Sequence, residues 1–141
     1  MRTNKASAEW RGNLKEGKGS LELPGLSKSL AFSFSSRFED AEGSNPEELI
    51  AAAHAGCFSM ALSGQLAANG FQPKVISTDA KVTIDKKGEG FAITKSELST
   101  SAEIPGISEE QFKELAETAK KNCPVSQALA SVEISLVAKL V

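Results

Sequence analysis

The chain has 141 residues, a usual length for one domain with a single hydrophobic core. Its 18 acidic and 16 basic side chains are mixed along the sequence and leave a net charge of −2, so the charge does not favour nucleic acid or an anionic membrane as a partner. The first ten residues lack the apolar core of a secretory signal, and two cysteines without such a signal indicate a reducing compartment. We therefore expect one cytoplasmic domain that spans residues 1–141.

The N-terminal third has the alternation of apolar and polar residues that is typical of β-strands. Residues 6–10 alternate, a glycine-containing turn follows at 15–19, and the alternation resumes at 21–23, which predicts a hairpin. The same period over residues 30–34 predicts a third strand. We expect this strand to continue to Arg37, which would then lie at a strand end before a polar loop.

A long apolar helix is predicted to follow. Asn45 is a good N-cap, Pro46 suits the first helical position, Glu48 can complete a capping box, and Gly70 can end the helix. No charged residue follows Glu48 within this segment, yet its Gly, Ser, His and Gln residues favour a buried core helix over a membrane span. A single sheet can cover only one side of such a helix, so we expect a homodimer in which the partner covers the rest.

The second half of the chain predicts further strands and two more helices. Two strands flank the turn at 85–90, and Leu98 falls out of phase with the preceding apolar residues, which indicates a β-bulge. Residues 108–111 form a second capping box before an amphipathic helix, and a short helix is expected to begin at Pro124. Alternation over 132–140 predicts a last strand. Strand blocks separated by helices are typical of an α+β fold with a mainly antiparallel sheet.

The two cysteines are the candidate reactive groups. Cys57 lies in the middle of the apolar helix, where a thiol often acts as a small apolar side chain and becomes reactive only if a nearby cation stabilises its thiolate. Cys123 directly precedes Pro124 and would occupy an N-cap, where backbone N–H groups favour an anion. A purely structural role stays open for both residues.

Arg37 is the natural source of a cation. Of the three arginines, it alone is expected close to the start of the long helix. Glu47, at the second helical position, could hold its guanidinium through two hydrogen bonds and so orient it. Glu48 has a ready structural task in the capping box, and we therefore favour Glu47 as the functional acid.

His54 lies three residues before Cys57, on a neighbouring position of the same helix. A Cys–His pair could activate the thiol, but a buried histidine hydrogen-bonded to its surroundings is the more common arrangement. A zinc site would need His54, Cys57, Cys123 and Glu47 to converge without any C-x-x-C motif, so we expect no metal. No flavin, haem or nucleotide motif is present, and we expect no cofactor, so that redox chemistry would use sulfur alone.

Two segments together carry a family resemblance. Residues 45–61 (NPEELIAAAHAGCFSMA) and residues 122–127 (NCPVSQ) closely resemble the OsmC/Ohr family of thiol peroxidases, and are nearer to its osmotically inducible OsmC branch than to the organic hydroperoxide resistance branch. The resemblance extends over essentially the whole chain. It implies an OsmC-like fold, an intertwined homodimer in which mainly antiparallel sheets wrap long central helices, with active sites at the subunit interface.

The resemblance also implies roles for the candidate residues. Cys57 matches the peroxidatic cysteine, Cys123 the resolving cysteine, and Glu47 the acidic partner of a catalytic arginine, for which Arg37 has the OsmC-branch position. Glu48 and His54 remain candidates for a supporting role beside them. The expected activity is reduction of organic hydroperoxides, and of hydrogen peroxide less well.

The expected reaction passes through a Cys57 sulfenic acid and a Cys57–Cys123 disulfide, which a dithiol reductant of the lipoyl type returns to the thiols. Two alternatives stay open. The chain could be a redox sensor or binding protein that is oxidised once without efficient turnover. The cysteines could also form a structural disulfide, which would stabilise the fold by about 4 kcal/mol in the chain-entropy model.

Overall fold

The computed structural model describes all residues from Met1 to Val141, in two compact units, Met1–Leu49 and Ile50–Val141. We call these the N-terminal unit and the C-terminal unit and describe each by itself. Six strands and four helices alternate in blocks, as predicted for an α+β chain. The single domain expected from the sequence stays a prediction.

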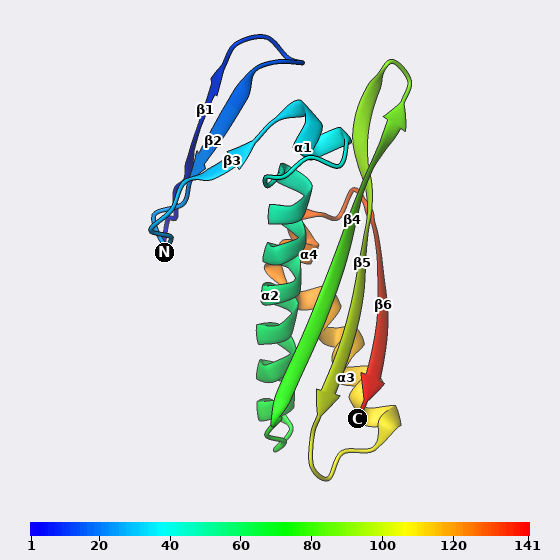
Figure 1. Ribbon diagram of the computed structural model, residues 1–141. Helices are drawn as coiled ribbons and strands as arrows, with labels where there is room; N and C mark the ends of the chain where they lie inside the picture. Colours follow the sequence, from blue (N-terminus) through cyan, green and yellow to red (C-terminus); the bar gives the residue numbers. More distant parts are fainter. The chain divides into compact units, whose positions relative to one another are not determined.

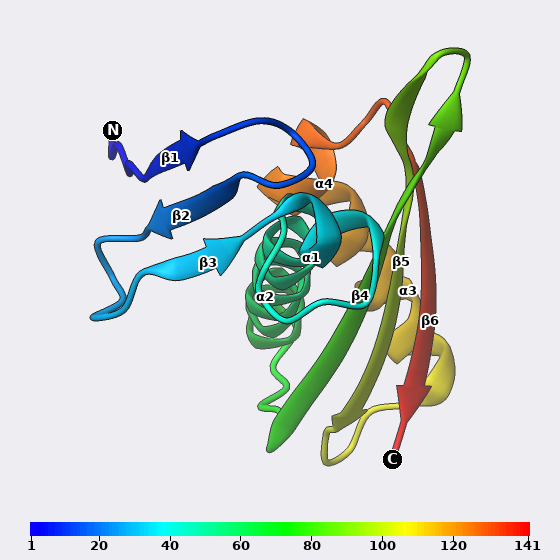
Figure 2. The same ribbon diagram turned by 45° about the horizontal axis from the view of Figure 1, so that its top comes forward.

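The N-terminal unit contains a three-stranded antiparallel sheet in the order β1-β2-β3, visible in Figure 2. Its strands are β1 (Ser7–Arg11), β2 (Lys18–Glu22) and β3 (Leu30–Phe32). The hairpin predicted from the alternation is therefore confirmed.

The third strand ends earlier than the alternation predicted. After Phe32 the chain turns into a short helix, α1 (Phe34–Phe38), so the prediction that Arg37 lies at a strand end is wrong. The reason is a local capping box. The Ser33 hydroxyl accepts from the Ser36 N–H at 3.0 Å, and the Ser36 hydroxyl accepts from the Ser33 N–H at 2.8 Å. These two bonds favour a helical turn over continued pairing with β2.

Helix α2 (Pro46–Ala68) has the ends that the sequence predicted. The Asn45 side-chain oxygen accepts the Glu48 N–H at 2.8 Å, which caps the first turn. Gly70 follows the helix with φ of +82°, a left-handed conformation that glycine adopts without steric cost. Glu47 lies in the first turn of this helix and Cys57 near its middle.

The C-terminal unit contains the second sheet, in the order β4-β5-β6 (Figure 1). Strands β4 (Val75–Lys87) and β5 (Gly90–Glu103) form a long antiparallel hairpin. Thr83 pairs with Lys95 and Ile84 with Ile93, which leaves Thr94 as an extra residue. This is the bulge that the phase of Leu98 predicted.

Strand β6 (Glu133–Leu140) runs parallel to β5, a pairing that the sequence analysis did not anticipate. The chain between them crosses over through α3 (Glu109–Asn122) and α4 (Pro124–Ala128). A parallel neighbour requires such a crossover, and helices commonly form it. The sheets are still mainly antiparallel, and the predicted fold class is confirmed.

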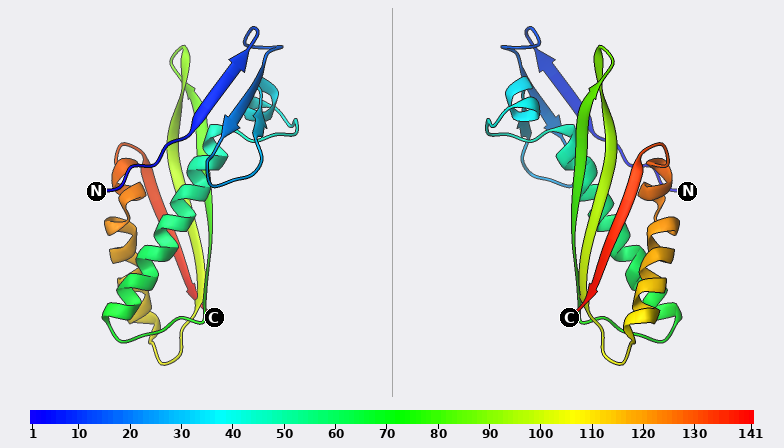
Figure 3. Two further views of the ribbon diagram at one scale, coloured as in Figure 1. Left: turned by 90° about the vertical axis from the view of Figure 1, so that its left-hand side faces the viewer. Right: turned by 90° about the vertical axis from the view of Figure 1, so that its right-hand side faces the viewer.

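The core of the C-terminal unit lies between this sheet and the helices on one of its faces (Figure 3). Phe58, Leu62 and Leu66, spaced four residues apart on α2, are fully buried, as are Phe112 and Ala116 on α3. Burial of one such stripe stabilises the unit by roughly 1.5–3 kcal/mol for each large side chain.

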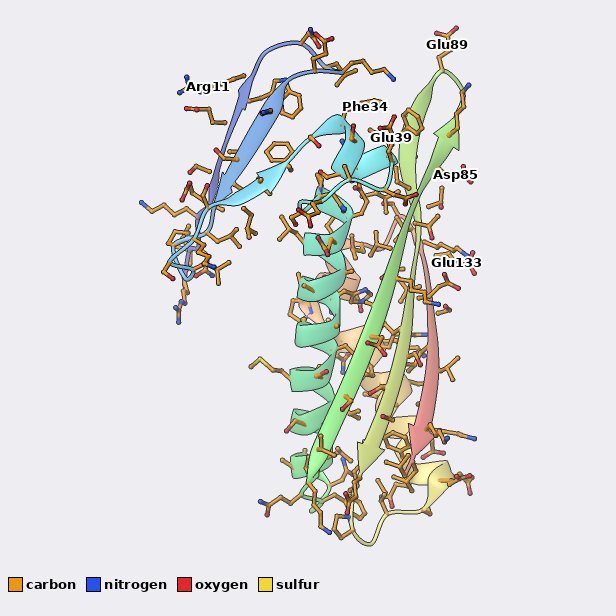
Figure 4. The ribbon with its side chains drawn as sticks, in the orientation of Figure 1. Arg11, Phe34, Glu39, Asp85, Glu89 and Glu133 are labelled. Carbon is orange, nitrogen blue, oxygen red and sulfur yellow. The ribbon has the colours of Figure 1, made fainter.

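The other sides of the C-terminal unit are exposed to solvent. Glu89 lies at the tip of the β4–β5 hairpin, and Asp85 and Glu133 project away from the sheet (Figure 4). The remaining side of α2 is exposed, with Met60 at 78%. By length and composition alone α2 could span a membrane, a test that core helices of soluble proteins also pass.

Candidate active site

The crossover brings the two cysteines together. Sγ of Cys57, on α2, lies 2.8 Å from Sγ of Cys123, which directly precedes α4, and the two free thiols share a hydrogen bond. Cys123 is fully buried, whereas Cys57 is partly exposed. Two thiols in contact can form a disulfide without a large rearrangement of the chain.

The surroundings of the two thiols shift their pKa values in opposite directions. Burial, followed by the hydrogen bond to Cys123, raises the pKa of Cys57, although the backbone N–H of Val125 acts in the other direction. Burial also disfavours the Cys123 anion, but hydrogen bonds from Cys57 and from Ser126 and Val125 outweigh it and lower the pKa of Cys123. Within the C-terminal unit the negative charge therefore favours Cys123.

The position of Cys123 explains this preference. It is the N-cap of α4, as the sequence predicted, with Pro124 at the first helical position. Its sulfur makes no full side-chain capping bond, yet the N–H groups of Val125 and Ser126 lie close enough to lower its pKa. Proline offers no N–H, so these two groups are the donors of the first turn that can act on the sulfur.

Arg37 and Glu47 form an ion pair within the N-terminal unit. Nε of Arg37 donates to both carboxylate oxygens at 3.2 Å, and Nη2 donates to Oε1 at 2.8 Å. Glu47 is almost buried, with 6% of its surface exposed, while the Arg37 side chain is 37% exposed. The carboxylate thus holds one edge of the guanidinium, and Nη1 keeps its donors free.

Glu48 has a different environment. Its carboxylate accepts from the Ser44 hydroxyl at 3.0 Å, and its N–H donates to the cap Asn45. Both bonds hold the loop before α2, so Glu48 supports the start of the helix and makes no contact with Arg37.

His54 is fully buried on α2 and does not contact Cys57 through its ring nitrogens. Its Nδ1 lies 2.7 Å from Oγ of Ser96, on β5, and its Nε2 lies 2.8 Å from Oγ of Ser126, on α4. Burial lowers the pKa of His54, which keeps the ring neutral at neutral pH. The sequence analysis did not single out either serine. A signal was available, since Ser126 is the third helical residue after Cys123 and Ser96 shares the inward phase of Leu98.

An apolar hollow of about 230 Å³ lies beside Arg37 within the N-terminal unit. Four aromatic rings line it together with Arg37, Leu14 and Ser33; the rings belong to Trp10, Phe32, Phe34 and Phe38. The Trp10 and Phe32 rings are 5.5 Å apart, and those of Phe34 and Phe38 are 5.0 Å apart. A guanidinium at the edge of an apolar hollow can bind a molecule with one polar and one apolar end.

No three His, Cys, Asp or Glu side chains gather closely enough to hold a metal ion. The C-terminal unit offers two sulfurs in contact, which are groups for thiol–disulfide chemistry, and the N-terminal unit offers an oriented guanidinium. The fold and this pair of thiols define an α+β protein with the components of a dithiol redox site.

The chain is similar to known proteins over nearly its whole length. The family model described as OsmC-like protein matches residues 39–137. Peroxiredoxin OsmC of Escherichia coli is 47% identical over 94% of this chain and 92% of its own length. An organic hydroperoxide resistance protein of Xanthomonas axonopodis is 30% identical over 67% of this chain and 66% of its own length.

Solved structures share the fold of this chain. An OsmC-like protein of unknown function from Vibrio cholerae has a TM-score of 0.77, at 18% identity, over 98% of this chain and 99% of its own. An organic hydroperoxide resistance protein from Elizabethkingia anophelis has a TM-score of 0.73, at 25% identity, over all of both chains. The chain belongs to the OsmC-like family, as the two cysteine segments indicated. It is a thiol-dependent peroxidase.

Proposed function

We propose that this protein reduces organic hydroperoxides, and hydrogen peroxide less well, with Cys57 as the attacking thiol and Cys123 as the resolving thiol. The observation that carries the proposal is the 2.8 Å contact between the two sulfurs. Their exposure supports the assignment of roles, because a peroxide can reach the partly exposed Cys57 more readily than the buried Cys123.

The proposed reaction has three steps. The Cys57 thiolate attacks the O–O bond of the hydroperoxide, an alcohol leaves, and Cys57 becomes a sulfenic acid. Cys123 then attacks the sulfur of Cys57 and water leaves, which gives a disulfide within the chain. A dithiol reductant, of the lipoyl type, restores both thiols by exchange.

The first step requires a Cys57 thiolate, and the groups around Cys57 in its own unit do not favour one, since burial raises its pKa. A cation must therefore come from elsewhere. Arg37 is the candidate, supplied by the same chain or by a second copy, because Glu47 already orients its guanidinium and Nη1 has free donors. Its positive charge would stabilise the thiolate and bind the peroxide oxygen.

The hollow beside Arg37 supports a preference for organic peroxides. An alkyl or aryl group could bury its surface against the four aromatic rings while the peroxide oxygens meet the guanidinium. Hydrogen peroxide has no apolar group to place there. The related protein from Xanthomonas axonopodis carries the name organic hydroperoxide resistance protein, which agrees with this choice.

We also propose that the protein is a homodimer in the cytoplasm, and the exposed side of α2 supports the homodimer. Gly56, Met60, Ser63 and Ala67 are all exposed along this side, and an added Cβ at Gly56 would meet nothing within 4 Å. A second copy of α2 could approach closely over the small residues Gly56, Ser63 and Ala67 and cover the apolar side chain of Met60. A stable monomer at micromolar concentration, measured by light scattering, would contradict this arrangement.

The central test is a steady-state assay with cumene hydroperoxide and dihydrolipoamide. We expect sustained turnover by the wild type, a Cys57–Cys123 disulfide after one equivalent of peroxide, and complete loss of turnover in Cys57→Ser. Turnover that survives in Cys57→Ser would exclude the mechanism. A wild type that consumes one equivalent and then stops with excess reductant would instead indicate a sensor.

A further inference from the structure

A chain of hydrogen bonds leads from the sheet to Ser126, the third residue of α4 after the resolving Cys123. It begins at Ser96 on β5, passes through both ring nitrogens of His54 on α2, and reaches Ser126 on α4, with contacts of 2.7 and 2.8 Å. His54 and Ser96 are fully buried and Ser126 is 6% exposed, so water cannot replace these partners. These three residues and Cys123 all belong to the C-terminal unit.

The burial of Ser96 indicates which atom donates in each of these hydrogen bonds. Its hydroxyl has a single partner, Nδ1 of His54, and a buried hydroxyl that donates to no acceptor destabilises the fold. Ser96 therefore donates to Nδ1, which must be unprotonated. The proton of the neutral ring is then on Nε2, and Nε2–H donates to Oγ of Ser126.

Ser126 is left with its own proton to donate. Its oxygen already accepts from His54. Ser126 is the third residue of α4 and Cys123 is the N-cap of that helix, a spacing at which a side chain can reach back to the cap residue. Both the hydroxyl and the N–H of Ser126 lower the pKa of Cys123. We propose that Ser96, His54 and Ser126 form a one-way donor chain that ends on Sγ of Cys123 and stabilises its thiolate for attack on oxidised Cys57. The chain uses no charged side chain.

This inference rests on the proposed function, because it concerns the second step of that reaction. The Cys123 thiolate attacks Sγ of the Cys57 sulfenic acid, an S–S bond forms, and the S–O bond breaks. The hydroxide that leaves takes up the proton that Cys123 released and becomes water. His54 stays neutral throughout, so it is a positioning residue that keeps the Ser126 hydroxyl turned toward the sulfur.

The chain can be tested without any peroxide. In a Cys57→Ser background only Cys123 can form a thiolate, and its titration can be followed by the thiolate ultraviolet absorbance. We expect Ser126→Ala and His54→Leu each to raise the midpoint by about one pH unit, and the two together to raise it no further, because both break the same chain.

Two further variants separate positioning from packing. His54→Gln places an amide N–H where the imidazole Nε2–H was, and we expect it to restore most of the shift. Thr100→Val is the control, since it removes another buried hydroxyl from β5, one that bonds to Thr78 and not to the chain. Thr100→Val should leave the midpoint unchanged.

The kinetic test uses protein variants that retain both cysteines, together with one equivalent of cumene hydroperoxide. Dimedone trapping and mass spectrometry should show that Ser126→Ala forms the Cys57 sulfenic acid at the normal rate but loses it about tenfold more slowly. An unchanged titration midpoint of Cys123 in folded Ser126→Ala and His54→Leu would overturn the proposed donor chain but would leave the proposed peroxidase function standing. A shifted midpoint in a protein that never forms a sulfenic acid would keep the chain and overturn the proposed function.

Discussion

The ion pair of the N-terminal unit and the proposed donor chain of the C-terminal unit both orient a hydrogen-bond donor, but by different physical means. Arg37 carries a permanent charge, and its side chain remains 37% exposed beside a nearly buried carboxylate. His54 is neutral, fully buried and acts through two serine hydroxyls. Water weakens both kinds of interaction, so the burial of His54 strengthens its hydrogen bonds, whereas the more exposed Arg37 depends on its permanent charge and on the nearly buried Glu47.

This comparison indicates how two hydrogen-bonded thiols can react one after the other, first Cys57 and then Cys123. Within the C-terminal unit the charge favours Cys123, because donors act on its sulfur and burial raises the pKa of Cys57. In the proposed mechanism the guanidinium of Arg37 moves the charge to Cys57 for the attack on peroxide. Once Cys57 carries a hydroxyl group, it no longer competes for the charge, and the donor chain activates Cys123.

Among variants that disturb this order of reaction, we expect Cys123→Ser to have the largest effect on turnover. The variant should consume one equivalent of peroxide per chain at the normal rate and then stop as a Cys57 sulfenic acid, because no second thiol remains. Steady-state turnover with a dithiol should fall by at least about 100-fold. Unchanged multiple turnover would show that Cys123 does not resolve the intermediate.

Arg37→Lys tests the ion pair, and we expect an effect of intermediate size on activity. An ammonium group keeps the charge but cannot reproduce the two-point contact with Glu47, so it should orient the peroxide poorly. We expect the first step to slow by roughly 10- to 100-fold and the pH midpoint for alkylation of Cys57 to rise. Arg11→Lys is the matched control, because Arg11 pairs with Glu9 on an exposed strand. Equal alkylation profiles for Arg37→Lys and the wild type would exclude Arg37.

A smaller effect is expected from the apolar hollow. Phe34→Ala removes one of its rings, which lies under the ammonium group of Lys15. We expect kcat/KM for cumene hydroperoxide to fall about fivefold to tenfold while that for hydrogen peroxide changes little. Phe91→Ala, at an exposed phenylalanine of β5, is the control. Parallel losses with both peroxides would argue against a substrate-binding role for the hollow.

The smallest effect concerns stability as a function of pH. Burial lowers the pKa of His54 in the folded chain, so the unfolded chain binds a proton more readily below about pH 6.5. The stability that neutral His54 contributes is therefore complete above that pH and is lost as the pH falls. Denaturant titrations of His54→Gln should show a pH slope smaller than the wild type's by up to about 1.4 kcal/mol per pH unit. Identical slopes would mean that His54 does not titrate in this range.

The sequence predicted those elements whose signals are local. The caps at Asn45 and Ser108 and the alternation of the strands depend on residues within one or two turns, and the helices begin where they indicated. Arg37 was misplaced for an equally local reason. The alternation through Phe34 continued in the sequence, but the Ser33–Ser36 capping box ended the strand.

What the sequence could not reveal depends on pairings between distant segments. The parallel contact of β5 with β6 joins strands separated by the whole crossover, and no residue pattern specifies the direction of a neighbour. The serines beside His54 are 42 and 72 residues away from it in the chain. The cysteine pair was anticipated only because both segments match a known family, since 66 residues separate the two thiols.

The exposed side of α2 has a consequence for any measurement of stability. Since the core stripe covers only one side of this helix, a second copy that covers the other side would bind folded chains and not unfolded ones. By mass action the melting temperature should then rise with the amount of protein in the cuvette. If the proposed dimer forms, thermal scans of this chain are comparable only at matched dilution.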